Sequence, residues 1–309
     1  MKKIALAIHG GAGTLLKGMM TAEKEVSYKK TLEAAITAGY NILEHNGNSV
    51  DAVVEALKLL EDSPLFNAGK GSVFTNAGTH EMDAAIMNGG NLEAGAVSLI
   101  SGIKNPVLLA KDIMEKSEHV FLAGTGAMDY AELLGYKLEP EDYFYDEFRF
   151  QQWQEIKNSG NFQLDHSVKK DSKFGTVGAV ACDFEGNLAA ATSTGGMTNK
   201  KFGRIGDSSM IGAGTYANNK TCAVSCTGSG EFFIRAVVAY DVSCLMEFKG
   251  LSLKEATEEV VQNRLLSIGG DGGLIAIDAE GNIAMPFNTE GMYRASIDTQ
   301  GNKNIAIYK

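Results

Sequence analysis

The sequence predicts a layered α+β fold, in which strands form sheets and helices cover the faces of those sheets. Apolar side chains recur at helical spacing over residues 22–45, which indicates an amphipathic helix. They alternate with other residues over 2–8, which indicates a strand. Residues 176–193 and 274–285 form two similar units, each with a glycine-containing turn between two apolar runs. Both units predict a β-hairpin.

The first half of the chain divides into short elements separated by turn residues. The helix over 22–45 stops at Asn46-Gly47, because glycine favours the end of a helix. Pro106 suits the first turn of a helix, where a missing backbone N–H costs no hydrogen bond. The other predicted elements are a helix from Asn48 or Ser49 to just before Pro64, strands over 82–87 and 93–99, a helix from Pro106 to about Ser117, a strand over 119–123 and a helix over 125–134.

Residues 139–174 differ from the segments on either side, because they are rich in charged and polar residues and show no clear period. A loop of this length inside a compact domain is usually functional or disordered. Aromatic residues over 143–150 and Trp153 indicate that the first part of the segment still packs, as a helix.

The second half of the chain returns to strands and helices. Strands are expected over 176–182, 188–193, 274–277 and 283–285, and helices over 230–248 and 252–267. The helix over 230–248 is nearly all apolar, which predicts that it is sandwiched between layers.

Length and charge limit the classes of partner. The 309 residues carry 28 basic and 38 acidic side chains, so the formal net charge is −10. Binding to a nucleic-acid backbone or to an anionic membrane surface needs a basic face, so neither partner is expected. No segment reaches the ~18 apolar residues of a membrane span. The 36 glycines and only 4 prolines indicate many tight turns and close backbone approaches.

The four cysteines favour a reducing compartment. The pair Cys222-x3-Cys226 could suggest a metal site, but Cys182 and Cys244 form no matching pair and no histidines cluster nearby. We therefore expect reduced thiols that fill core positions. The apolar run over 4–8 is too short for a signal peptide, so a cytoplasmic protein is expected.

The familiar nucleotide and hydrolase motifs are missing. The sequence His9-Gly-Gly-Ala-Gly13 follows a strand, but Leu16 stands where a dinucleotide-binding motif needs its third glycine. The pair Gly124-Thr-Gly126 fails in the same way. The chain also lacks a P-loop, a G-x-S-x-G elbow, an H-E-x-x-H pair and an EF-hand loop.

Four blocks of small polar and glycine residues follow the polar segment. They cover residues 174–180, 191–196, 203–207 and 225–231. Each block has a plain structural interpretation. Thr176 could simply open a strand, Arg204 and Asp207 could be a surface ion pair, and residues 227–230 could form the N-cap of the next helix.

Taken together and in order, these blocks resemble the plant-type L-asparaginase and isoaspartyl peptidase family of N-terminal nucleophile hydrolases. The resemblance covers nearly the whole chain, with further matching blocks at 8–13, 63–69, 272–278 and 285–294. It implies a four-layer αββα sandwich that forms one domain over 1–309. It also implies self-cleavage into an α subunit, 1–175, with a flexible linker over about 155–175, and a β subunit, 176–309.

Self-cleavage before Thr176 makes chemical sense. A threonine hydroxyl is a poor nucleophile and needs a base within hydrogen-bond reach. A chain-terminal amine, with a pKa of about 7.7–8.0, is such a base. Cutting the bond between Gly175 and Thr176 would place both groups on one residue. Gly175 also allows the backbone to bend sharply at the cut.

The resemblance implies the roles of the other catalytic residues. Thr194 would hydrogen-bond near the Thr176 hydroxyl and hold it in place. The Thr227 hydroxyl and the Gly228 N–H would form the oxyanion hole. One such donor is worth roughly 3–4 kcal/mol in a well-studied hydrolase.

The substrate-binding residues are also implied by the resemblance. Arg204 would bind the α-carboxylate of the substrate and Asp207 its α-ammonium group, with Gly230 and Asn67 beside them. Such a pair suits the free end of an amino acid whose side-chain amide is cut. Asn67 could instead only form a turn.

The family also has a loop that binds sodium through backbone carbonyls, and no other cofactor is required. The corresponding residues here are Leu60, Glu61, Ser63, Phe66, Ala68 and Lys70. The charge of Lys70 and the serine at position 63 depart from the family pattern.

The expected reaction is hydrolysis of the β-amide of asparagine and of β-aspartyl dipeptides through an acyl-enzyme on Thr176. By resemblance, two cleaved units would pair as an (αβ)2 assembly. Two alternatives remain, a glycosylasparaginase and an uncleaved binding protein without activity.

Overall fold

The computed structural model describes residues 4–13, 15–18, 20–158 and 175–309. The second part of the polar segment, 159–174, lies outside the described residues. Its first part forms two short helices, as the aromatic residues predict. The first strand, β1 (Ala5–Gly13), is longer than the predicted 2–8 and runs through the glycine motif, with its register shifted between His9 and Ala12.

Eight strands form the larger sheet, in the order β12-β11-β1-β5-β6-β2-β3-β4. All neighbours pair antiparallel except β3 and β4. The strands other than β1 are β2 (Met82–Asn88), β3 (Ala94–Ile100), β4 (Phe121–Ala123), β5 (Thr176–Cys182), β6 (Leu188–Thr194), β11 (Gly291–Ile297) and β12 (Lys303–Tyr308). The predicted hairpin of β5 and β6 is confirmed, and its turn contains Gly186 with φ 83°.

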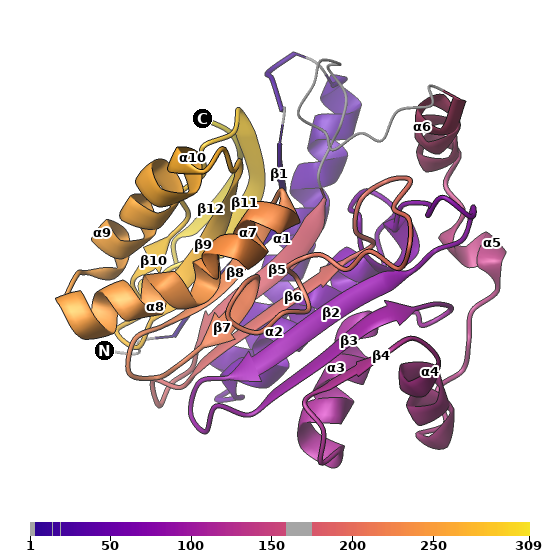
Figure 1. The fold of residues 1–309 in the computed structure, drawn as a ribbon. Helices are drawn as coiled ribbons and strands as arrows, with labels where there is room; N and C mark the ends of the chain where they lie inside the picture. The colour runs from indigo at the N-terminus through magenta and orange to yellow at the C-terminus, as the bar shows by residue number, and fades with distance from the viewer. Residues whose placement is uncertain (1–3, 14, 19, 159–174) are drawn as a thin grey trace.

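A second sheet of four strands packs against one face of the first (Figure 1). Its strands, in the order β10-β9-β8-β7, are β7 (Thr215–Ala217), β8 (Cys222–Gly228), β9 (Gly272–Asp278) and β10 (Ile283–Ala284). The predicted hairpin of β9 and β10 is confirmed. Small side chains such as Ala7, Val180 and Ala223 are fully buried in the cluster that joins the two sheets. Their small size allows the sheets to approach closely.

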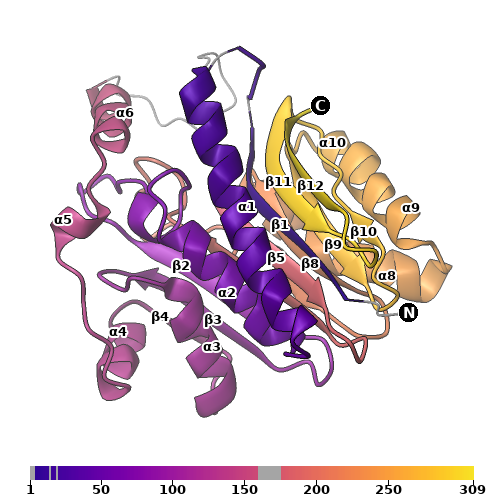
Figure 2. The same ribbon diagram turned by 180° about the vertical axis from the view of Figure 1, so that it is seen from behind.

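Helices cover the outer face of the large sheet (Figure 2). They are α1 (Ala22–Glu44), α2 (Ser49–Glu61) and α3 (Pro106–Lys116), and all three were predicted within a few residues. The side chain of Thr21 caps α1, and that of Asn48 caps α2 by accepting a hydrogen bond from the N–H of Asp51 at 2.7 Å. Further along lie α4 (Gly124–Leu133), α5 (Glu141–Phe144) and α6 (Glu147–Asn158), the last at the periphery.

A second group of helices covers the outer face of the small sheet. It contains α7 (Gly230–Ala236), α8 (Val238–Lys249), and a continuous helical stretch made of α9 (Leu253–Glu258), the π-helix η2 (Glu259–Arg264) and α10 (Leu265–Ser267). A capping box of Ser252 and Glu255 starts this stretch. None of the described helices is long and apolar enough to cross a bilayer.

The prediction of one apolar helix sandwiched over 230–248 is wrong in two respects. The helix breaks at Val237, which takes a left-handed conformation with φ 50°. The helices also form an outer layer, since Phe248 is 73% exposed and Tyr240 40% exposed. Only one face of α8 packs on the sheet, through residues such as Val242 and Leu245.

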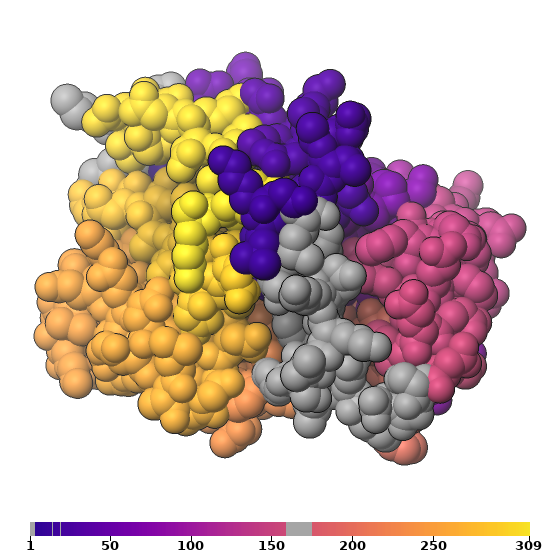
Figure 3. All heavy atoms as spheres, turned by 90° about the horizontal axis from the view of Figure 1, so that it is seen from above, coloured from indigo at the N-terminus to yellow at the C-terminus, as the bar shows by residue number. Residues whose placement is uncertain are grey.

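Segments that are distant in the sequence lie on opposite sides of the molecule. Seen from above, the orange and yellow atoms of the C-terminal segments lie on one side of the molecule, and the pink atoms around α6 lie on the other (Figure 3). Strand β5 runs through the middle of the large sheet, between β1 and β6. The first residue of β5 is Thr176.

Candidate active site

Thr176 and Thr194 lie directly opposite each other on neighbouring strands. Thr176 is the first residue of β5 and Thr194 the last of β6, and the two are paired in register. The hydroxyl of Thr176 donates a hydrogen bond to Thr194 Oγ1 at 3.2 Å. The N–H of Gly196 donates to the same oxygen at 3.0 Å. The Thr176 hydroxyl is therefore held at the end of a central strand, beside the loop that follows β6.

Thr227 and Gly228 end strand β8 of the smaller sheet. Thr227 is buried, and its Oγ1 accepts a hydrogen bond from the N–H of Ala12 at 3.2 Å. Gly228 has φ 155°, and a side chain there would lie 2.3 Å from the carbonyl oxygen of Asp271. The N-cap of α7 is Ser229, whose side chain makes no capping hydrogen bond to the helix and instead donates to Asp271. The structure therefore places this pair at a strand end, not in a plain helix cap.

Arg204 pairs with Glu231 and not with Asp207, the partner expected in a surface ion pair. Its Nε and Nη2 donate to the two carboxylate oxygens of Glu231, at 2.9 and 3.0 Å. This two-pronged contact fixes the plane of the guanidinium group. A side chain at Gly230 would lie 3.0 Å from Arg204 Nη2, so glycine leaves the approach to the cation open. The sequence alone indicated no role for Glu231, which is 27 residues away from Arg204.

Asp207 is buried, so the surface-pair interpretation is wrong for it. It is only 5% exposed, and its Oδ2 has no hydrogen-bond partner among the described residues. Burial raises its pKa to about 7, although the charge of Arg204 opposes that shift. A side chain at Gly230 would lie 2.8 Å from Asp207 Oδ1. A buried carboxyl group with a free oxygen next to a fixed guanidinium forms a site for one cation and one anion held side by side.

His9 links the nucleophile to the smaller sheet, which no sequence motif indicated. Its Nδ1 lies 3.0 Å from the carbonyl oxygen of Thr176, and its Nε2 lies 3.0 Å from Ser225 Oγ. A carbonyl only accepts, so Nδ1 carries the proton and Nε2 accepts from Ser225. Thr192 extends the chain at 2.7 Å from Ser225, and Thr215 donates to Thr192 at 2.6 Å. Burial lowers the pKa of His9 to about 3, so this histidine is neutral and is no base near neutral pH.

Asn67 lies beside the residue that precedes Thr176. A side chain at Gly175 would lie 2.7 Å from Asn67 Cβ. The amide of Asn67 is already bonded on both sides, with Nδ2 donating to Gly196 O at 2.7 Å and Oδ1 accepting from Val73 N at 3.0 Å. Asn67 thus joins two loops around the nucleophile, and its contact with substrate stays a prediction.

The loop expected to bind sodium is tightly curled. A side chain at Gly71 would lie 2.1 Å from the carbonyl oxygen of Phe66 and 2.7 Å from that of Pro64. Carbonyl oxygens crowded in this way suit a hard cation. Lys70 points its ammonium group over the ring of Tyr143, at 5.1 Å from the ring centroid. The charge of Lys70 is therefore directed at an aromatic face. The carbonyl oxygens of Leu60, Phe66 and Ala68 already accept backbone hydrogen bonds, so a sodium ion held by this loop stays a prediction.

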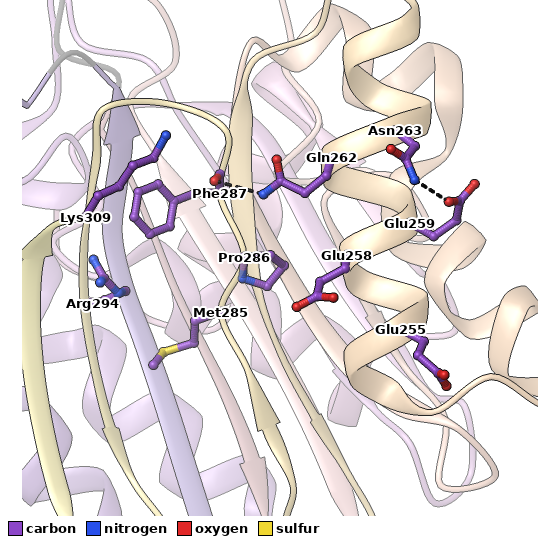
Figure 4. Close-up of a pocket in the computed structure, with 10 residues that line it drawn as sticks. All are labelled: Glu255, Glu258, Glu259, Gln262, Asn263, Met285, Pro286, Phe287, Arg294 and Lys309. Atoms are coloured by element: carbon purple, nitrogen blue, oxygen red, sulfur yellow. Dashed lines mark hydrogen bonds between the residues drawn. The ribbon is translucent and has the colours of Figure 1, made fainter.

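A hollow of about 680 Å³ lies elsewhere, between the η2 region and the residues around β10 (Figure 4). None of Thr176, Thr194 and Thr227 lines it. Its principal cation, Arg294, donates to the carbonyl oxygens of Met292 and Tyr308. This hollow offers no nucleophile, so its size does not make it the reaction centre.

The cysteines do not have the character of metal ligands. All four are free thiols, and three of them are buried. Burial raises the pKa of Cys222 to about 12, which disfavours the thiolate that a metal needs. No group of three or more acidic, histidine or cysteine side chains is arranged to hold a metal within the parts of the chain that the structure describes. The core-filling interpretation agrees with these observations.

Comparison with known proteins places the chain in a family. A family model described as asparaginase matches residues 2–307. An isoaspartyl peptidase of Escherichia coli (strain K12) is 52% identical over 298 residues, which cover 96% of this chain and 93% of the relative. An isoaspartyl peptidase of Salmonella typhimurium is 51% identical over 298 residues, covering 96% and 95%. A plant-type L-asparaginase of Pyrococcus abyssi is 42% identical over 305 residues, covering 94% of each chain.

These matches span nearly the whole chain and confirm the family predicted from the four blocks and the glycine motif. This chain belongs to the asparaginase family.

Proposed function

We propose that this protein hydrolyses the β-amide of L-asparagine and the isopeptide bond of β-aspartyl dipeptides, after cutting itself between Gly175 and Thr176. The observation that carries the proposal is the placement of Thr176. Its hydroxyl is fixed by Thr194 at 3.2 Å on the first residue of a central strand. Relatives that are 42–52% identical are named isoaspartyl peptidase or plant-type L-asparaginase.

The same hydroxyl serves both steps. In the cut, Thr176 Oγ1 attacks the carbonyl carbon of Gly175, the bond to the Thr176 nitrogen breaks, and water hydrolyses the resulting ester. The released amine then acts as the base for the second reaction. It takes the proton of the hydroxyl as Oγ1 attacks the substrate amide. It passes that proton to the leaving nitrogen, and water later frees aspartate from the acyl-enzyme.

The other residues have separate tasks in this mechanism. The Thr227 hydroxyl and the Gly228 N–H stabilise the negative oxygen that forms on the attacked carbonyl. Arg204, held flat by Glu231, binds the α-carboxylate of the aspartyl part. Asp207 binds the α-ammonium group. The buried Oδ2 of Asp207 has no hydrogen-bond partner among the described residues, and the ammonium group would provide one.

The assembly extends this proposal. Two packed sheets with helices on both outer faces support an N-terminal nucleophile hydrolase fold with four αββα layers. Pairing of two such units into (αβ)2 is part of the same proposal and rests on membership of the family alone. A sodium ion held by the carbonyls of residues 60–70 would have a structural role, stiffening the loop that carries Asn67.

A substrate panel tests the proposed reaction. Purified enzyme is assayed with L-asparagine, with β-aspartyl dipeptides and with N4-(N-acetylglucosaminyl)-asparagine, by measuring released aspartate. We expect aspartate from the first two classes only, and none from a Thr176→Ala variant. Release from the glycosylated substrate alone would make the protein a glycosylasparaginase. No release from any substrate by cleaved protein would leave the binding-protein alternative.

A further inference from the structure

A small cavity of about 90 Å³ lies next to Gly175. It is separate from the α-end residues of the site, since Arg204, Asp207 and Gly230 do not line it. Four of its lining residues are aromatic, and the lining comes from six separate parts of the chain. The lining residues are Gly10, Lys24, Tyr28, Pro64, Leu65, Phe66, Asn67, Asp146, Phe148, Arg149, Gly175 and Tyr293.

Arg149 brings a buried positive charge to this cavity. The residue is 6% exposed on α6, and no salt bridge joins it to a carboxylate among the described residues. Its guanidinium makes one long hydrogen bond, from Nη1 to Gln152 Oε1 at 3.4 Å. Asp146, the acid in the lining, accepts from the Arg149 backbone N–H at 3.0 Å. Burial lowers the pKa of Arg149, while the neighbouring Tyr28, Asp146 and Tyr293 oppose that shift.

Tyr293 adds a buried hydroxyl to this cavity. The residue is 3% exposed, and burial together with the neighbouring Tyr28 hydroxyl raises its pKa. Its ring stacks on that of Tyr28, with centroids 4.3 Å apart. The Tyr28 hydroxyl donates to the carbonyl oxygen of Leu65 at 3.1 Å, and its oxygen can still accept a hydrogen bond from Tyr293. A buried guanidinium that has one long hydrogen bond and faces a cavity is unusual unless a ligand or an ordered water completes its hydrogen bonds.

The chemistry of self-cleavage indicates which part of the substrate lies near Gly175. The nitrogen of Thr176 is bonded to the carbonyl carbon of Gly175 until the chain is cleaved. After cleavage this nitrogen must reach the leaving nitrogen of the substrate, because it delivers the proton to it. The leaving group of the substrate therefore occupies the space on the Gly175 side of Thr176. The cavity lined by Gly175, Asn67 and Gly10 adjoins that space.

We propose that this cavity, here named the leaving-group subsite, binds the α-carboxylate of the amino acid released from a β-aspartyl dipeptide. Arg149 and the Tyr293 hydroxyl donate hydrogen bonds to that carboxylate, and Lys24 adds positive charge at the lining. This inference rests on the proposed function, since it names the part of the site that recognises the second residue of the substrate. Asparagine, which releases ammonia, does not use the subsite.

The test compares two substrates on one enzyme. We measure kcat/KM of the cleaved Arg149→Met variant for a β-aspartyl dipeptide and for L-asparagine. Active sites are counted by titration, so that uncleaved protein does not lower the measured kcat. We expect a loss of about 10- to 100-fold for the dipeptide, as for a charged hydrogen bond, and a change of less than about twofold for asparagine. Methionine keeps much of the length of the side chain and removes the buried charge.

Two further measurements isolate the carboxylate. A β-aspartyl dipeptide with a C-terminal amide should be cleaved equally by parent and Arg149→Met enzymes, because it lacks the group that Arg149 binds. Tyr293→Phe should lower dipeptide kcat/KM severalfold and change that for asparagine by less than about twofold, because it removes the hydroxyl and keeps the ring that stacks on Tyr28. Lys157→Met is the matched control, since Lys157 lies on the same helix, over the Trp153 ring, and does not line the cavity.

Each result decides the inference. Equal losses for dipeptide and asparagine in Arg149→Met, or no loss for either, would overturn the subsite while leaving the proposed function intact. The subsite is likewise overturned if the amide-capped dipeptide is affected as strongly as the free dipeptide. Failure of the parent enzyme to hydrolyse either substrate would instead contradict the proposed function itself.

Discussion

Burial changes the protonation of Asp207 near neutral pH. The carboxyl group has a pKa of about 7, raised mainly by desolvation, and it carries its negative charge only above that pH. In the proposed mechanism, the charged form of Asp207 binds the α-ammonium group of the substrate. Once the ammonium is bound, the charge of Asp207 is stabilised, and its pKa falls. Protonation of Asp207 therefore affects substrate capture more than the chemical step.

We expect KM for asparagine to rise as the pH falls below about 7, by about tenfold for each pH unit. The amine of Thr176 should control kcat in the same range, since it is the base. Steady-state kinetics from pH 5.5 to 8.5 separates the two parameters. A KM that stays constant over this range would show that Asp207 does not bind the ammonium group. His119→Asn is a suitable control, because that residue is exposed and far from the described site in the sequence.

On the scale of single elements, strand β5 depends on one glycine for its contact with the smaller sheet. A side chain at Gly178 would lie 2.0 Å from Ser225 Oγ and 2.2 Å from His9 Nε2. These two atoms make the hydrogen bond that connects the Thr176 carbonyl to the smaller sheet. A side chain at position 178 would therefore disturb the contacts that hold Thr176 in place.

Gly178→Ala should destabilise the protein by roughly 1–3 kcal/mol through overpacking. It should also lower activity by about a hundredfold, because a small displacement of a nucleophile is costly. Thermal unfolding and asparagine hydrolysis measure the two effects. Gly126→Ala is the matched control, since nothing lies within 4 Å of a side chain at that position and alanine favours the helix. Near-parent activity in Gly178→Ala would contradict this role of His9.

The elements also show what the sequence can and cannot predict. Helix α1 and helix α2 were predicted because each has a one-sided apolar stripe and a capping residue. Strands β8 and β11 were not, because polar residues such as Ser225, Thr227 and Arg294 interrupt their apolar runs. Thr176 could be proposed as the nucleophile from motif order alone. The contacts of Glu231, His9 and Arg149 could not, because each depends on a partner brought close by folding.

At the scale of the whole molecule, Glu61 makes stability depend on pH. The residue is fully buried, its Oε1 accepts from Val107 N at 3.0 Å, and its Oε2 has no partner among the described residues. Burial raises its pKa from 4.5 to about 8. A folded-state pKa above the unfolded one gives stability that is present below about pH 4.5 and is lost as the pH rises towards 8.

Glu61→Gln removes this pH dependence and keeps the acceptor for Val107. Between pH 5.5 and 7.5, the variant should gain up to about 3 kcal/mol of unfolding free energy relative to its parent. Urea unfolding at both pH values measures this in a Thr176→Ala background, where we expect one uncut chain. Glu55→Gln, on the same helix but only partly buried, should show no such change. A pH-independent difference for Glu61→Gln would contradict the raised pKa.

The central claim is that one hydroxyl, on Thr176, both cuts the chain and attacks the substrate. The most direct measurement is N-terminal sequencing and intact mass of active, purified protein, together with its Thr176→Ala variant. We predict two chains from the parent, the smaller beginning Thr-Val-Gly-Ala, and one inactive chain from the variant. A fully active protein whose only chain is intact would contradict the claim, because its Thr176 would have no free amine to act as the base.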